Sequence, residues 1–236
     1  MQLSRKHFVS ALGVTAGALS TSASSLAADE PGERAPVHFH ILKPNEFDRA
    51  AMMSVLSSAH PHKQVFHTST PLLIAPGVSS LYIHMQNSMN AHEFSFGFGK
   101  NGYIPLGVLL GASAVLALND DLWKKYGFGD ALKLAPSNIY YKATSDLSKP
   151  ASPDDPAGIY QDWSAQAIMH RGGKFMVCHN AMTAVAALFA PKAGVTPQAA
   201  LAEFERGVLP GFLVVPAGVA AIQLAQQHGY TLFAII

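Results

Sequence analysis

The stretch GFLVVPAGVAAIQLAQQHGYTLFAII, residues 211–236, decides the fold class of this chain. It begins with a short apolar run of the kind found in buried strands. A helix follows, with Pro216 as its first residue and Gly229 as its last. A second apolar strand closes the chain. A strand, a helix and a strand in succession are the unit from which parallel sheets are built.

The same alternation extends upstream. KFMVC (174–178) reads as a strand, and the helix HNAMTAVAALFA (179–190) begins directly after it. Further strands are expected at VHFHIL (37–42), KQVFH (63–67) and the start of the apolar run 104–118. Further helices are expected at 46–58 after Asn45, 78–94, 119–129, 158–173 and 196–208 after Thr196. PLLIAPG (71–77) reads as a loop and 130–156 as an irregular insertion. This order predicts an α/β fold with a mostly parallel sheet and helices on both faces.

The first residues have the pattern of an export signal. Arg5 and Lys6 precede a modest apolar stretch, and small residues lead to a cleavage site before Ala28. The apolar stretch is too short to span a bilayer. The segment SRKHF is similar to a twin-arginine signal with Lys6 in the second arginine position. We therefore expect an export signal at 1–27, an N-terminal arm and helix at 28–60, an α/β domain at 61–236, and a periplasmic location with no membrane contact after cleavage.

Composition excludes several classes of protein. Of 236 residues, 49% are hydrophobic and only 13% charged, which is typical of a well-buried globular domain. Removing the signal takes away two of the 16 basic residues and none of the 15 acidic ones, so the remainder is almost neutral. No basic cluster suggests a nucleic-acid partner. No G-x-S-x-G elbow or Walker loop is present.

Cys178 is the only cysteine, so the chain cannot form an internal disulfide. It lies where a strand is expected to end and a helix to begin, and ligands of open parallel sheets bind at this end of the strands. A helix N-terminus stabilises a thiolate, which is the reactive form of cysteine. His179 would add to this if its ring turned toward the sulfur. The alternative, a buried and inert packing residue, has equal weight on this evidence.

Two other patterns carry less weight. GFGKNG (97–102) matches G-x-G-x-x-G, but it follows a helix and precedes a strand, the reverse of a dinucleotide site. We therefore expect no cofactor. The pair His38 and His40 and the group His60, His62 and His67 contain metal-binding side chains without the tight spacing of a dedicated site. The sequence therefore assigns no metal.

Four short motifs, together with the block LPGFLVVPAGVAAIQLAQQHGY (209–230), resemble the exported branch of the DsrE/DsrF-like family. The motifs are HKQVF (62–66), NSMNA (87–91), DDLWKKY (120–126) and VCHNA (177–181). The resemblance covers roughly residues 63–236. It implies a three-layer, flavodoxin-like α/β fold and assembly into oligomers. It also implies that the cysteine at this strand end carries sulfur as a persulfide, a role that falls on Cys178.

Our first hypothesis is therefore a periplasmic sulfur carrier or sulfurtransferase. Cys178 would take sulfur from a sulfane-sulfur donor and pass it to an acceptor protein, with His179 and Asn180 positioning the sulfur. The second hypothesis is a non-catalytic module that binds a small ligand or a metal at the strand ends, near Gly111, Cys178 and Pro216. A third is that the chain serves only as an interaction surface in an assembly. We also expect the chain to form a homo-oligomer.

Overall fold

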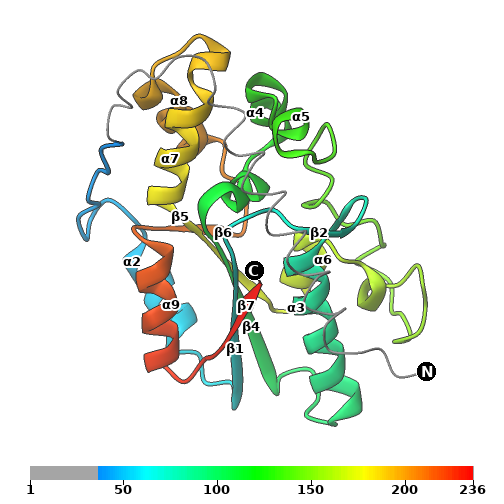
Figure 1. The fold of residues 1–236 in the computed structure, drawn as a ribbon. Helices are drawn as coiled ribbons and strands as arrows, with labels where there is room; N and C mark the ends of the chain where they lie inside the picture. The colour runs from blue at the N-terminus through cyan, green and yellow to red at the C-terminus, as the bar shows by residue number, and fades with distance from the viewer. Residues whose placement is uncertain (1–36, 236) are drawn as a thin grey trace, which may run out of the picture. The chain divides into compact units, whose positions relative to one another are not determined.

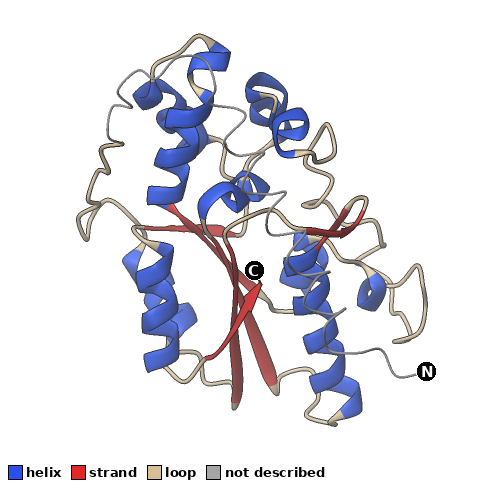
Figure 2. Cartoon of the chain, in the orientation of Figure 1, coloured by secondary structure: helices blue, strands red, loops and turns tan. Residues whose placement is uncertain are grey.

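Five parallel strands form the centre of the structure, a computed structural model that describes residues 37–235 (Figures 1 and 2). They are β1 (His62–Thr68), β4 (Tyr103–Leu109), β5 (Lys174–Cys178), β6 (Phe212–Val215) and β7 (Thr231–Ile235). Their order across the sheet is β6-β5-β4-β1-β7. The expected export signal, 1–27, lies outside the described residues, as does the first part of the arm expected at 28–60.

The helices are α2 (Arg49–Leu56), α3 (Ser80–Asn90), α4 (Asp120–Tyr126), α5 (Phe128–Leu132), α6 (Ala165–His170), α7 (His179–Phe189), α8 (Pro197–Arg206) and α9 (Gly218–Gln227). They cover both faces of the sheet, so the chain has the expected three-layer, flavodoxin-like α/β fold. None of the helices among residues 37–235 has the length and apolar character needed to cross a membrane.

The two faces of the sheet have separate cores. On one face, α3, α6 and α7 bury their apolar sides together with the short helices α4 and α5. On the other face, α2 and α9 pack on residues of β1, β4, β5 and β6. The chain steps from β1 to β4, β5 and β6 in one direction and then returns to place β7 on the far side of β1. Because crossovers between parallel strands have one hand, the returning helix α9 lies on the opposite face from α7.

Several local predictions differ from the structure. VHFHIL forms no strand, because no strand pairs with residues 37–42. The predicted loop 71–77 contains most of a small antiparallel hairpin, β2 (Leu73–Ala75) and β3 (Val78–Ser79), which turns at Gly77 with φ +77°. The first helix begins at Arg49 and not after Asn45, since the carboxylate of Asp48 accepts the Ala51 backbone N–H at 2.8 Å and serves as its N-cap.

The segment expected to form one helix at 158–173 is divided. A short 3₁₀ turn, Ile159–Gln161, precedes α6, and Ser164 caps α6 by accepting the Ala167 N–H. The insertion expected at 130–156 begins inside α5, which extends to Leu132, and the rest of it contains no helix or strand. The 3₁₀ turn that follows the insertion is fastened to α3, because the Gln86 side chain donates to the carbonyls of Ile159 and Asp162.

Candidate functional site

The carboxyl ends of β5 and β6 form the candidate site. Cys178, the last residue of β5, lies beside Val215, the last residue of β6. From these two strand ends the chain continues into α7 on one face and into α9 on the other. Adjacent parallel strands whose connections leave on opposite faces create the crevice in which α/β proteins bind ligands. Cys178 therefore lies at the topological switch point of the sheet.

Cys178 is the N-cap of α7. Its Sγ accepts the backbone N–H of Ala181 at 3.3 Å, and the residue is 7% exposed. The positive end of the helix dipole and an N–H donor thus both point at the sulfur. The start of a helix at the sulfur is as expected from the junction of strand and helix.

A second helix also begins beside the thiol. α9 starts at Gly218, where an added Cβ would come within 3.1 Å of the Cys178 Cβ and would overlap the Leu110 side chain. Glycine is therefore required here by close packing and not by its backbone angles. Sequence reasoning did not single out Gly218 or Leu110, because their contact joins segments more than 100 residues apart.

His179 is buried, but its ring is held by a partner that the sequence did not reveal. Nε2 of His179 lies 2.9 Å from Oε1 of Glu205 in α8, and the residue is 1% exposed. Its Nδ1 has no hydrogen-bond partner among the described residues. The ring of His40 approaches it edge-on, with 6.5 Å between centroids. The described contacts of His179 thus run to α8 and to the N-terminal segment.

The other three predicted residues differ in their positions. Asn180 is half-buried in the first turn of α7, next to Cys178 and His179. Pro216 is half-buried and directly follows β6, so it lies at the same end of the sheet as Cys178. Gly111 is exposed and has φ +45°. A Cβ added at this position would lie 2.6 Å from the carbonyl oxygen of Ser69, which follows β1. Gly111 therefore shapes the junction of β1 and β4, and its neighbour Leu110 is the residue that reaches α9.

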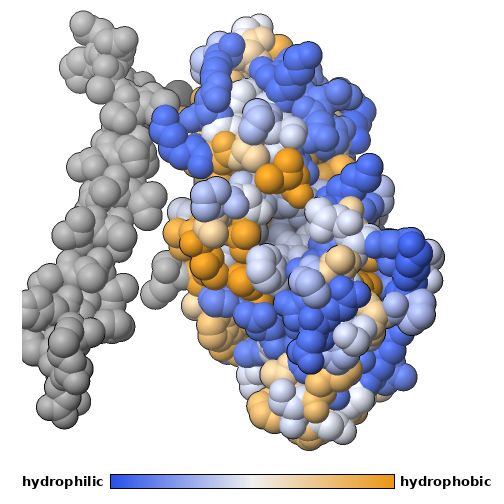
Figure 3. Space-filling view, turned by 90° about the vertical axis from the view of Figure 1, so that its right-hand side faces the viewer, coloured by the Kyte–Doolittle hydropathy of each residue, from blue (hydrophilic) through white to orange (hydrophobic). Residues whose placement is uncertain are grey.

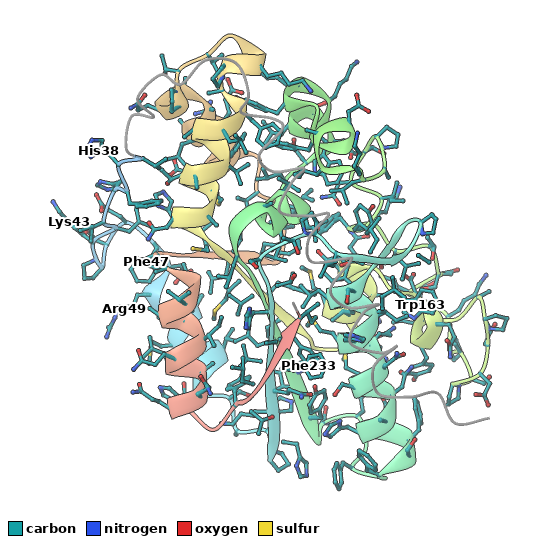
Figure 4. All side chains as sticks on the ribbon, in the orientation of Figure 1. His38, Lys43, Phe47, Arg49, Trp163 and Phe233 are labelled. Carbon is teal, nitrogen blue, oxygen red and sulfur yellow. The ribbon has the colours of Figure 1, made fainter. Side chains whose placement is uncertain are left out.

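The segment before α2 runs past the start of α7, where His40 approaches His179. Figure 4 shows His38 and Lys43 on the outer side of this segment and Phe47 at its inner end, close to the start of α9. Phe47 packs against the core beneath α2 and α9. His40 in the same segment also contacts Glu46, with 3.2 Å between Nε2 and Oε2. Residues 37–47 therefore form one border of the Cys178 site.

The histidines considered as metal ligands are dispersed. Nδ1 of His60 bonds the Ser58 hydroxyl at 2.6 Å, whereas His62 stacks on Phe98 with 4.1 Å between centroids. Burial lowers the pKa of His67, which favours its neutral form. Within residues 37–235, no group of three or more His, Cys, Asp or Glu side chains is arranged to hold a metal ion.

The chain matches no protein-family model, no curated protein and no solved structure. The interpretation of the site therefore rests on its geometry and on the motifs in the sequence.

Proposed function

We propose that this chain is a sulfur carrier of the DsrE/DsrF-like type and that Cys178 is its catalytic residue. The observation that carries the proposal is the position of Sγ, which lies at the switch point of the sheet and accepts an N–H from the first turn of α7. A thiolate held in this way is a nucleophile toward sulfane sulfur.

The proposed step is an exchange at sulfur. The Cys178 thiolate attacks the outer sulfur of a sulfane donor and forms a new S–S bond. The donor's own S–S bond breaks, and its electron pair leaves on the released group, which is sulfite for thiosulfate and a shortened chain for polysulfide. The product is a Cys178 persulfide with no net oxidation. An acceptor thiolate then removes the outer sulfur and restores the thiol.

The surroundings of Cys178 support small donors. The residue is 7% exposed and borders α9, whose first residue leaves no room for a side chain. We assign Asn180, in the first turn of α7, and Pro216, directly after β6, to contacts with the transferred sulfur. His179 acts as a positioning residue, because its bond to Glu205 ties the start of α7 to α8.

Intact mass of the purified protein tests the proposal. After incubation with thiosulfate or polysulfide, we expect the mass to rise by single sulfur atoms in the native chain and not in Cys178→Ala. Reductant should reverse the gain. A thiol that gains no sulfur and resists a small alkylating agent in the folded state would make Cys178 a packing residue and would favour the ligand-binding module.

We also propose that the mature chain is periplasmic and forms a homo-oligomer. Export is supported by the signal-like pattern before Ala28, and cell fractionation of the full-length chain tests it. Assembly is supported by β7, an edge strand that pairs on one side with β1 and has no partner on its other side among the described residues. Leu232 and Phe233 of this strand are 43% and 40% exposed. Uncharged apolar edge strands favour pairing with another chain.

A further inference from the structure

We propose that a second site, at the amino edge of the sheet, binds a small organic anion. A cavity of about 260 Å³ lies between the insertion, the end of α3 and the end of α6. α6 leads into the amino end of β5, whereas Cys178 is at the carboxyl end of the same strand. The cavity is therefore separate from the proposed sulfur site, and the inference does not depend on sulfur transfer.

The charge of the cavity favours an anion. Its lining includes Lys100, Lys149 and Arg171 and a single carboxylate, Glu93. Glu93 is already engaged, because it accepts from Nη2 of Arg171 at 2.9 Å. Lys100 forms no ion pair within residues 37–235.

Lys149 has a weaker counter-charge. It pairs with Asp146 at 3.2 Å, but the two side chains are 77% and 50% exposed. Ion pairs with this exposure are screened by water and contribute little. The cavity thus keeps an excess of positive charge.

The side chain of Arg171 is held in one position at the wall of the cavity. Its side chain is 4% exposed, and Nη1 donates to Oε1 of Gln86 at 2.8 Å and to Oδ1 of Asn90 at 2.6 Å. The guanidinium also lies over the Tyr160 ring, 4.6 Å from its centroid. Its Nε is buried and has no hydrogen-bond partner among the described residues. Because Arg171 also lines the cavity, its guanidinium is a fixed positive charge at the wall, and such a charge favours an anionic ligand.

The wall beside Arg171 is built from an unusual element. α3 continues into a π-helical turn, Ala91–Ser95, which carries Glu93 and Phe94. Phe94 packs edge-on against Tyr160 with 4.9 Å between centroids, and Asn90 donates to the Tyr160 carbonyl at 2.8 Å. π-helical turns are rare and occur frequently at functional sites.

The remaining lining defines the ligand class. The lining also contains apolar surface from Leu147, Pro150, Ala151 and Ile159. The volume is slightly below the roughly 300 Å³ at which pockets for drug-sized molecules begin. The occupant is therefore a small molecule with one oxyanion group, a carboxylate or a phosphate ester, on an apolar body. Figure 3 shows the side of the molecule that carries α3, α6 and the insertion, where hydrophilic and hydrophobic side chains alternate.

Calorimetric titration with phenyl phosphate, benzoate and inorganic phosphate tests the proposal on the full chain. We expect at least one of the two aromatic anions to bind, more tightly than inorganic phosphate, and binding to weaken as salt is added. The double variant Lys100→Met/Lys149→Met should lose affinity at least tenfold. The matched control Lys124→Met/Lys192→Met removes the same charge from α4 and the turn after α7 and should bind like the native chain.

The choice of variants keeps the test independent of folding, since both cavity lysines are on loops and Arg171 is left in place. Three results would overturn the proposal: no binding of either aromatic anion, equal loss in both double variants, or inorganic phosphate binding as tightly as the aromatic anions. Sulfur loading of Cys178 should be the same in all of these proteins, so a failure at the cavity is distinguishable from a failure of the sulfur proposal.

Discussion

Replacing Asp162 with asparagine should destabilise the protein strongly, because this buried carboxylate fastens the insertion. Oδ2 accepts the backbone N–H groups of Thr144 and Ser145 at 2.8 and 2.7 Å and the Ser145 hydroxyl at 2.8 Å. Oδ1 accepts the Ser164 N–H at 3.1 Å. The residue is 4% exposed, so water does not compete freely for these bonds.

The size of the expected loss in stability follows from the hydrogen bonds that an asparagine amide cannot make at this position. Asparagine has one acceptor oxygen, so in either orientation its NH₂ group faces at least one N–H donor. The variant also loses the negative charge, and hydrogen bonds to a charged group contribute about 1.5–3 kcal/mol each. We expect Asp162→Asn to lower the free energy of unfolding by about 2–4 kcal/mol at pH 7. Urea unfolding monitored by tryptophan fluorescence measures this loss.

The effect should also depend on pH. Burial alone would raise the pKa of Asp162, but hydrogen bonds from Ser145, Ser164 and Thr144 together hold it below its ordinary value. A carboxyl with a lowered pKa in the folded state contributes its full stability above the unfolded pKa of about 4. That contribution is lost as the pH falls through the folded value. The difference between native and variant proteins should therefore shrink below about pH 4.

Asp146→Asn is the matched control. Its side chain is 50% exposed and bonds only to residues within the same turn, so we expect a change within about 0.5 kcal/mol. If Asp162→Asn changes stability no more than this control, or if its effect persists unchanged at acid pH, the fastening role of the carboxylate is wrong.

Two further predictions concern the sulfur site and the edge of the sheet. Gly218→Ala places a methyl group against Leu110 and the Cys178 Cβ, so we expect the free energy of unfolding measured in urea to fall by about 1–3 kcal/mol. Alkylation of Cys178 should also become slower. Unchanged alkylation would show that α9 does not limit access to the thiol. Leu232→Lys puts a charge on the exposed strand β7, and we expect a smaller assembly by light scattering, whereas Thr231→Ser on the same strand should leave its size unchanged. Equal assembly of the native chain and the lysine variant would remove β7 from the interface.

The elements that sequence reasoning predicted well are those with local signals. The run KFMVC is apolar and short, and the helix after it is rich in alanine, so β5 and α7 could be placed on either side of Cys178. The helix expected to begin at Asn119 does begin there, with Asn119 as the N-cap of α4, but it ends at the left-handed Gly127 and not at residue 129.

The features that were missed depend on partners distant in the sequence. Asp162 divides the helix expected at 158–173, because it bonds to residues 144 and 145 across the insertion. Glu205 is partly exposed on α8 and resembles any solvent-facing residue until α7 packs beside it and brings His179 within 2.9 Å. Nothing in the local pattern of either residue indicates its partner.

The two proposed sites occupy opposite ends of β5. This strand has five residues, and at about 3.3 Å per residue it separates its ends by roughly 13 Å. Cys178 at one end depends on α7 and α9, whereas Arg171 at the other depends on α3 and the insertion. Substitutions separated by more than about 7–10 Å without shared partners usually act independently. The proposed anion site is therefore independent of the proposed sulfur site, because different helices hold the side chains that would form each of them.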